Sequence, residues 1–143
     1  MKRKHLLALA TFALGAQAAI AGSHTTTYPL KPVLDAQSAD SKVAFYFGDA
    51  AHPAVTASFG DKTEGVRVAR KTDGETMSCN AALTQALDAL RKDALDRGAN
   101  AVIDIETSFH QTHTVSSTEF TCATSMSAAA LKVHGQLVTL DAK

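Results

Sequence analysis

The histidines in the second half of the chain have the spacing that points most directly to chemistry, because they could bind a metal. His110 and His113 form an H-x-x-H pair, and Glu106 and Glu119 lie close to them in the sequence. Imidazole and carboxylate groups are ligands that Zn²⁺ and Cu²⁺ accept. Residues three apart on a regular strand point to opposite faces, so the two rings could converge only in an irregular loop. A solvated polar hairpin is the competing interpretation.

A small basic cluster is the second candidate site. Arg67, Arg70 and Lys71 stand beside a turn-like segment and could receive an anionic ligand or an acidic partner. Because Asp73 and Glu75 are adjacent, a solvated turn is the alternative. The sequence contains no G-x-S-x-G nucleophile elbow, and it predicts no catalytic residue and no cofactor.

The first residues of the chain have the pattern of a secretory signal peptide. Residues 1–21 read MKRKHLLALATFALGAQAAIA, with a basic start, an apolar run over 6–14 and small residues at the end. An apolar run of about nine residues is short of the ~20 that a spanning helix needs, so we expect no stable membrane anchor. Cleavage is expected before Gly22 or after Ala18. The signal peptide predicts a periplasmic or secreted protein. A buried N-terminal helix is the alternative.

The only two cysteines, Cys79 and Cys122, are expected to form a disulfide, because an exported chain matures where thiols are oxidised. The bridge would close a loop of about 43 residues, worth ~4 kcal/mol in the chain-entropy description. Redox pairs usually occur as C-x-x-C, and structural zinc sites need four ligands with short spacings. Neither pattern is present in this sequence.

Length and charge limit the remaining possibilities. A chain of 143 residues with 45% hydrophobic and 20% charged residues is typical of one small globular domain. The formal net charge is zero, but residues 22–143 carry 11 basic and 14 acidic side chains, a net charge of −3. Nucleic-acid recognition normally needs a basic surface, so we expect no nucleic-acid partner.

The clearest predicted element is a helix over 79–97, with Ser78 as its N-cap and Gly98 as a left-handed C-cap. Its apolar stripe follows the i, i+4, i+7 and i+11 spacing and consists of Leu83, Leu87, Leu90 and Ala94. This face must be buried against other elements.

Strands are expected on both sides of the helix. Short strands are predicted over 42–47, 54–59 and 66–69, with a turn at Gly60-Asp61 between the last two. The three strands after the helix, over 101–109, 118–124 and 128–140, are predicted to form an antiparallel meander.

Two details of these strands are also predicted. In the strand over 101–109, Ala101, Ile103 and Ile105 are expected on one side. Gly135 in the last strand marks a bulge or a close backbone approach. The resulting fold is α+β, with one main helix packed on an antiparallel sheet. Residues 42–143 form the domain, and 22–41 form an extended, partly mobile lead-in.

The segment DRGANAVIDI at 96–105, followed by SMSAAALKVHGQLV at 125–138, resembles the YbjQ family, small proteins named for heavy-metal binding. The chain more closely resembles exported bacterial proteins of unknown function, in which a cysteine at the helix start and one in a later strand match Cys79 and Cys122. The helix, turn and strand core is also similar to the outer-membrane lipoprotein that senses envelope stress for the Rcs phosphorelay. The resemblance covers roughly residues 66–138.

Proteins of this exported group often carry the name excinuclease ATPase subunit, which the sequence does not support. A P-loop needs G-x-x-x-x-G-K-[ST], whose backbone amides and lysine hold phosphates. Gly60 and Gly65 have this spacing, but Val66 and Arg67 follow them. No paired cysteine clusters of a DNA-repair zinc module are present either.

The sequence therefore predicts an exported, non-enzymatic binding domain, which the resemblance connects with the envelope or a stress response. Its partner, a protein or a small ligand, is not specified by the residues. A heavy-metal-binding protein that uses His110 and His113 is the alternative. Assembly into homo-oligomers through exposed strand edges is compatible with this fold.

Overall fold

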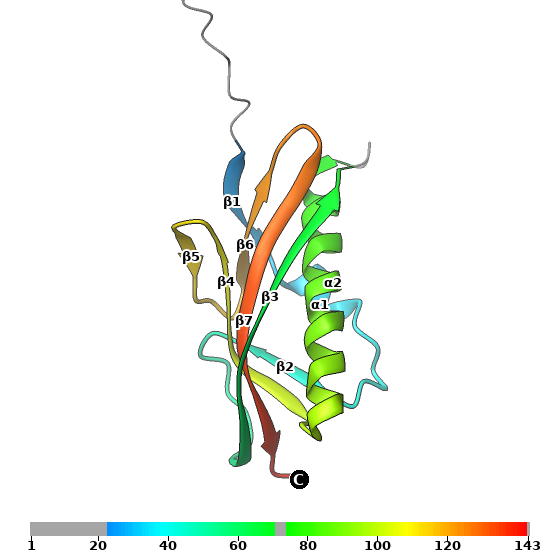
Figure 1. Cartoon of the computed structure of the whole chain (residues 1–143), viewed down its shortest axis with the longest axis vertical. Helices are drawn as coiled ribbons and strands as arrows, with labels where there is room; N and C mark the ends of the chain where they lie inside the picture. The colour runs from blue at the N-terminus through cyan, green and yellow to red at the C-terminus, as the bar shows by residue number, and fades with distance from the viewer. Residues whose placement is uncertain (1–22, 71–73, 143) are drawn as a thin grey trace, which may run out of the picture.

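The computed structural model of the chain describes residues 23–70 and 74–142, so the predicted signal peptide lies outside the described residues. In chain order the elements are β1 (His24–Pro29), α1 (Lys31–Asp35), β2 (Ala44–Phe47), β3 (Val55–Ala69), α2 (Gly74–Arg97), β4 (Ala101–Phe109), β5 (Thr112–Thr114), β6 (Glu119–Thr124) and β7 (Ala128–Leu140). The strands form one 7-stranded sheet, and α2 lies along one of its faces (Figure 1). The predicted α+β class is confirmed, with one main helix on a sheet and a C-terminal strand meander.

Strand β7 is the centre of the sheet. It pairs antiparallel with β3 along its whole length, with β4 on its other side, and with the end of β6 through the two pairs Ala123↔Ala130 and Thr124↔Ala129. The pairs β1–β6 and β4–β5 are also antiparallel, but β2 runs parallel to β4. The sheet is therefore mixed and not wholly antiparallel, because β3 and α2 form a crossover connection long enough for parallel pairing.

The segment expected to be an extended, mobile lead-in, 22–41, contains ordered elements that belong to the fold. The threonine-rich β1 pairs with β6 over its full length, and α1 follows it with proline in its first turn. Tyr28, Leu30 and Val33 are buried in the main core. These contacts are made with β6 and α2, far away in sequence, which is why local composition does not reveal them.

A single arginine of α2 holds the end of this segment. Arg91 donates hydrogen bonds to Ser41 Oγ at 3.1 Å and to Gln37 Oε1. Its guanidinium also lies 5.1 Å from the centre of the Phe45 ring, within the range of a cation–π contact. The connection from α1 to β2 is thereby fixed to the helix.

Strand β3 replaces the two short strands that were predicted over 54–59 and 66–69. It is continuous over 15 residues, and Gly60 has a φ of +90° where a turn was expected. The register against β7 shifts between Ser58 and Asp61. Gly60 therefore forms part of a β-bulge within one long strand, because glycine tolerates this backbone conformation.

The main helix begins earlier than predicted and ends where it was expected. Ser78 lies inside α2, and its Oγ donates to the Gly74 carbonyl at 3.0 Å, so it is not the N-cap. At the other end Gly98 has a φ of +78°, and the Ala99 amide donates to the Ala94 carbonyl at 2.8 Å. This is the left-handed Schellman ending that the glycine predicted. The predicted stripe is buried.

A bulge in β4 changes which residues face the helix. Asp104 has a φ of 51°, and the register against β7 shifts between Ile103 and Glu106. As a result Val102 and Ile105 pack in the main core with α2. A separate small cluster on the other face contains Ala101, Ile103, Val138 and Leu140. The prediction that Ile103 and Ile105 share one side is therefore wrong, since one extra residue reverses the alternation.

Gly135 lies on β7 beside the bulge of β4, where atoms of β4 leave no room for a side chain, as the predicted close approach requires. A Cβ atom at this position would be 2.5 Å from Val102 Cγ1 and 3.2 Å from Ile105 Cγ1. We expect Gly135→Ala to lower the free energy of unfolding by about 1–3 kcal/mol, the usual cost of overpacking a core. Urea unfolding of the purified variant measures the change.

Gly65 on β3 provides the matched control for this substitution. A Cβ there would contact only Lys132 Cγ, at the ordinary distance of 3.8 Å. Gly65→Ala should therefore unfold at or above the urea concentration of the wild type. Equal losses of stability in the two variants would mean that the close approach at Gly135 does not limit the size of its side chain.

Candidate functional site

The two histidines of the predicted metal site lie at the β4–β5 hairpin and have different surroundings. His110 is in the turn with a φ of 52°, and its ring contacts that of Phe109 at a centroid distance of 4.2 Å. His113 is on β5, and its Nε2 lies 3.0 Å from Glu106 Oε2. Within residues 23–70 and 74–142, no group of three or more His, Cys, Asp or Glu residues is placed to hold a metal ion.

We therefore expect the protein to bind transition metals only weakly. A tight site needs three or four ligands held by supporting hydrogen bonds, whereas the hairpin brings only Glu106 to His113. Calorimetric titration of tag-free protein with Zn²⁺ and with Cu²⁺ should show no submicromolar site. A one-to-one site of submicromolar affinity that His110→Ala or His113→Ala abolishes would establish the metal-binding alternative.

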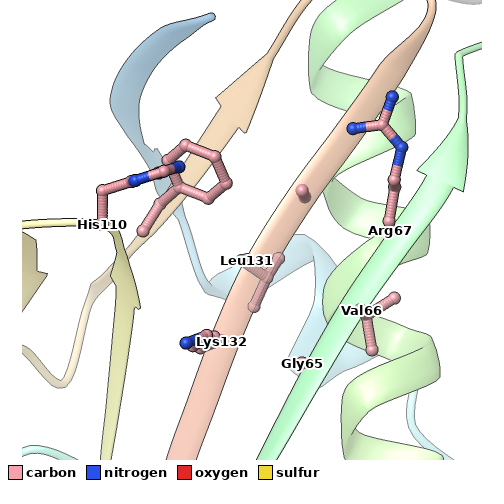
Figure 2. Close-up of a pocket in the computed structure, with 8 residues that line it drawn as sticks. Gly65, Val66, Arg67, His110, Leu131 and Lys132 are labelled. Atoms are coloured by element: carbon pink, nitrogen blue, oxygen red, sulfur yellow. The ribbon is translucent and has the colours of Figure 1, made fainter.

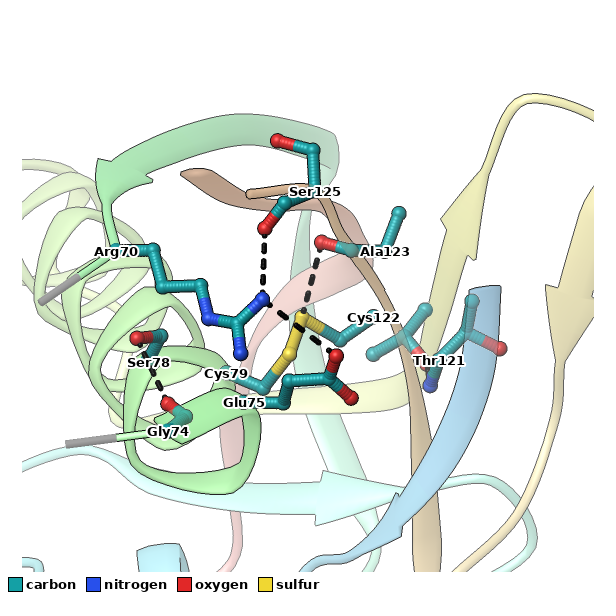
Figure 3. Close-up of a disulfide and its surroundings, with 10 residues drawn as sticks. Arg70, Gly74, Glu75, Ser78, Cys79, Thr121, Cys122, Ala123 and Ser125 are labelled. Carbon is teal, nitrogen blue, oxygen red and sulfur yellow. Dashed lines mark hydrogen bonds and ion pairs between the residues drawn. A yellow bond between two sulfur atoms is a disulfide. The ribbon is translucent and has the colours of Figure 1, made fainter. Parts of the chain in front are cut away.

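The predicted basic cluster is divided by the structure. Arg70 at the end of β3 donates to the Ser125 carbonyl at 2.9 Å and lies 3.5 Å from Glu75 Oε1, so it ties β3 to the β6–β7 turn and to α2 (Figure 3). Lys71 lies outside the described residues. Arg67 is exposed on β3. The anion-binding hypothesis therefore depends on Arg67 and on what surrounds it.

A pocket of about 300 Å³ lies beside Arg67 on the face of the sheet that α2 does not cover (Figure 2). Arg67 is on β3 and His110 is in the β4–β5 turn, on either side of β7, which itself carries Lys132. The residues that line the pocket include Gly65, Arg67, Phe109, His110, Ala130 and Lys132. Three separate segments therefore meet at this site.

Strand register explains why this part of the sheet is hollow. Gly65 is paired with Lys132, and Arg67 is paired with Ala130, so two small residues alternate with two long cations on one face. Pairing of β4 with β7 ends at Ser108↔Lys132. Beyond this pair the β4–β5 turn separates from β7. The surface above Gly65 is therefore open, since a Cβ there would meet only Lys132 Cγ among the described residues.

The two cations of the pocket have no counter-ion among residues 23–70 and 74–142. Among the described residues, neither Arg67 nor Lys132 forms an ion pair. Glu64 belongs to the other face of β3, where Lys62 Nζ lies 3.8 Å from Glu64 Oε1. There burial and then the neighbouring Asp93 carboxylate raise the pKa of Glu64.

Two acidic side chains on the pocket face, Glu106 and Asp61, lie beside histidines. Glu106 contacts His113, and Asp61 Oδ2 lies 3.6 Å from Nε2 of His134. His134 is also hydrogen-bonded through Nδ1 to Thr63 Oγ1 at 2.7 Å. These two carboxylates thus contact histidines and not the cations of the pocket.

The disulfide predicted from the sequence is present. Cys79 Sγ and Cys122 Sγ are 2.05 Å apart, and both residues are fully buried (Figure 3). The bridge joins the second turn of α2 to the middle of β6. Because both cysteines form this disulfide, neither can serve as a nucleophile.

Sequence analysis did not identify Gly65, Ala130 or Lys132 as site residues. A glycine and an alanine in strands indicate nothing by themselves, and Lys132 is an ordinary exposed charge. Only the register between β3 and β7 places them together. The one signal in the sequence was Arg67, which was grouped with its neighbours in the chain and not with Lys132 across the sheet.

Comparison of the chain with protein-family models, curated proteins and solved structures finds no match. Among the described residues, no helix has both the length and the apolar character needed to cross a membrane. The resemblance to YbjQ-like proteins stays an expectation, and the candidate site rests on its geometry.

Proposed function

We propose that the protein is an exported, non-enzymatic domain that binds a ligand in the pocket between β3, β7 and the β4–β5 turn. The observation that carries this proposal is a hollow with two cations, Arg67 and Lys132, that have no acidic partner among the described residues. Ligand sites are typically concave and largely apolar, with a few polar groups that select the ligand. The envelope or stress role implied by the resemblance is compatible with such a domain.

The composition of the pocket favours binding over catalysis. Of the residues that line it, His110 is the one whose type most often serves as a general acid or base. The contact that the structure gives its ring is with Phe109, not with a carboxylate or hydroxyl that would orient it. General acid–base and nucleophilic catalysis both require such an oriented group.

Export is supported by two independent features. The order of basic, apolar and small residues over 1–21 is that of a signal peptide, and a buried disulfide suits an oxidising compartment. Intact mass of the protein from the periplasm or medium should correspond to a chain that starts at Gly22 or Ala19. A chain that retains Met1 and stays in the cytoplasm would contradict export.

Binding at the pocket can be tested by identifying the small molecules that the purified protein retains. Wild-type protein is incubated with a periplasmic small-molecule extract, desalted and examined by native mass spectrometry. We expect a bound species on the wild type that is absent from Gly65→Leu, whose side chain would occupy the hollow. Gly65→Ala adds only one methyl group and should keep the ligand.

Two results would contradict the proposed site. One is a wild-type protein that retains no molecule, and the other is a Gly65→Leu variant that retains the ligand as well as the wild type does. Thermal unfolding of each variant shows whether the fold is intact. Gly65 has no left-handed backbone angle, so a larger side chain there causes no backbone strain.

A further inference from the structure

We infer that the pocket selects an organic monoanion, a carboxylate attached to a short apolar body. The inference rests on the proposed function, because it specifies the ligand class for that same site. It depends on three features of the pocket, which are the placement of its cations, the pairing of the neighbouring acids and the apolar character of the hollow.

The two cations lie on neighbouring paired strands beside the hollow. Arg67 pairs with Ala130 and Lys132 pairs with Gly65, so the two charged side chains stand diagonally across the hollow. A guanidinium can donate two parallel hydrogen bonds to a carboxylate, and an ammonium adds a point charge. A carboxylate bound in the hollow would therefore have one cation on each of the two paired strands beside it.

The neighbouring carboxylates do not compete for these cations. Glu106 is next to His113, and Asp61 is next to His134. The nearest acid of β3 in sequence, Glu64, contacts Lys62 on the opposite face. An added anion therefore meets positive charge that no described side chain neutralises.

The rest of the pocket suits an apolar group of limited size. Phe109 and the small residues Gly65 and Ala130 contribute apolar surface. A volume of about 300 Å³ is at the lower end of the range of ligand pockets, roughly 300–1,000 Å³. A single aryl ring or a short alkyl chain matches this volume. Inorganic phosphate would leave the apolar part empty.

The ligand class is tested with three probes by calorimetry at low ionic strength. 3-Phenylpropanoate has both the charge and the body, 3-phenylpropanamide has the same body without the charge, and inorganic phosphate has charge without a body. We expect 3-phenylpropanoate to bind at least about tenfold more tightly than either of the others, since each lacks one set of contacts. Its affinity should fall as salt is added, because both cations are exposed.

Variants assign the binding to named residues. Arg67→Gln and Lys132→Gln should each weaken 3-phenylpropanoate binding by about 3- to 10-fold, and Gly65→Leu should abolish it. Lys92→Gln is the matched control, because Lys92 lies on α2 and contacts Asp96 at 2.9 Å on the other side of the sheet. It should bind like the wild type, and thermal unfolding should confirm that every variant is folded.

The inference would be overturned by an amide that binds as tightly as the carboxylate, or by phosphate that does so. Binding that survives both glutamine substitutions would also overturn it. These failures differ from failure of the proposed function. If the wild type retains a periplasmic molecule that Gly65→Leu loses, the binding role stands even when the carboxylate probe fails.

Discussion

Replacing both Cys79 and Cys122 with alanine is expected to lower the free energy of unfolding by about 2–5 kcal/mol, the usual cost of losing a native disulfide in a small secreted domain. The two residues are separated by 43 positions, so the bridge restricts a long loop of the unfolded chain. Such a loss is a large share of the roughly 5–15 kcal/mol that stabilises a domain.

The position of the bridge predicts which strands lose most stability when the bridge is removed. β1 pairs with β6 alone, and β6 is joined to β7 by only two register pairs, Ala123↔Ala130 and Thr124↔Ala129. The Cys79–Cys122 bond supplies a covalent link from β6 to α2. Without it, β1 and β6 should open locally more often than β3, β4 and β7.

Hydrogen exchange and urea unfolding measure these two effects. Amides of β1 and β6 should exchange faster in the double variant than in the wild type, while those of β7 should change less. A reductant should reproduce the loss in the wild type and leave the double variant unaffected. Two freely alkylated thiols in wild-type protein purified without reductant would refute the bridge itself.

Leu87→Ala is expected to cost ~2–5 kcal/mol, as for other large-to-small changes at buried leucines. Leu87 has no exposed surface and lies in the main core between α2 and the sheet. The substitution removes buried apolar contacts and leaves a cavity, which rigid β-sheet neighbours can fill only partly.

Lys92→Ala is the control on the same helix. The Lys92 side chain is 77% exposed and forms an ion pair with Asp96 at 2.9 Å. Exposed pairs of this kind contribute little to stability, so the urea midpoint should match that of the wild type. Equal shifts in the two variants would show that the buried face of α2 has been assigned incorrectly.

Local patterns predicted the elements whose signal is contained in a few neighbouring residues. The spacing of Leu83, Leu87 and Leu90 predicted the buried face of α2, and Gly98 predicted its end. The disulfide followed from cysteine count and expected compartment. In each case the physical cause acts over one helical turn or through one covalent bond, so it is visible in the sequence.

The errors concern features that depend on distant pairing. β1 is stabilised by β6, almost a hundred residues later in the chain, and the long β3 is stabilised by its register with β7. Asp104 looks like an ordinary outward-facing residue, yet its left-handed backbone angle reverses the alternation of β4. Nothing in the local composition distinguishes a strand that bulges from one that does not.

The candidate site was predictable only in part, for the same reason. Arg67 was identified as a basic residue that could meet an anion, but its partner across the pocket, Lys132, lies 65 positions away. Gly65 and Ala130 matter because they lack bulk, and the absence of bulk has meaning only when the neighbouring strands are known. A pocket built from small residues is therefore less visible to sequence analysis than one built from reactive residues.

The central position of β7 has a consequence for the order in which the fold can assemble during synthesis. β3, β4 and β6 all use β7 as a partner, and β7 comprises residues 128–140. A ribosome adds residues at about 5–20 per second, so β3, β4 and β6 are synthesised before their shared partner β7. Folding is then limited by contacts distant in sequence, which are slow to form. The sheet therefore cannot close until almost the whole chain has been made, and β3, β4 and β6 lack their shared partner until then.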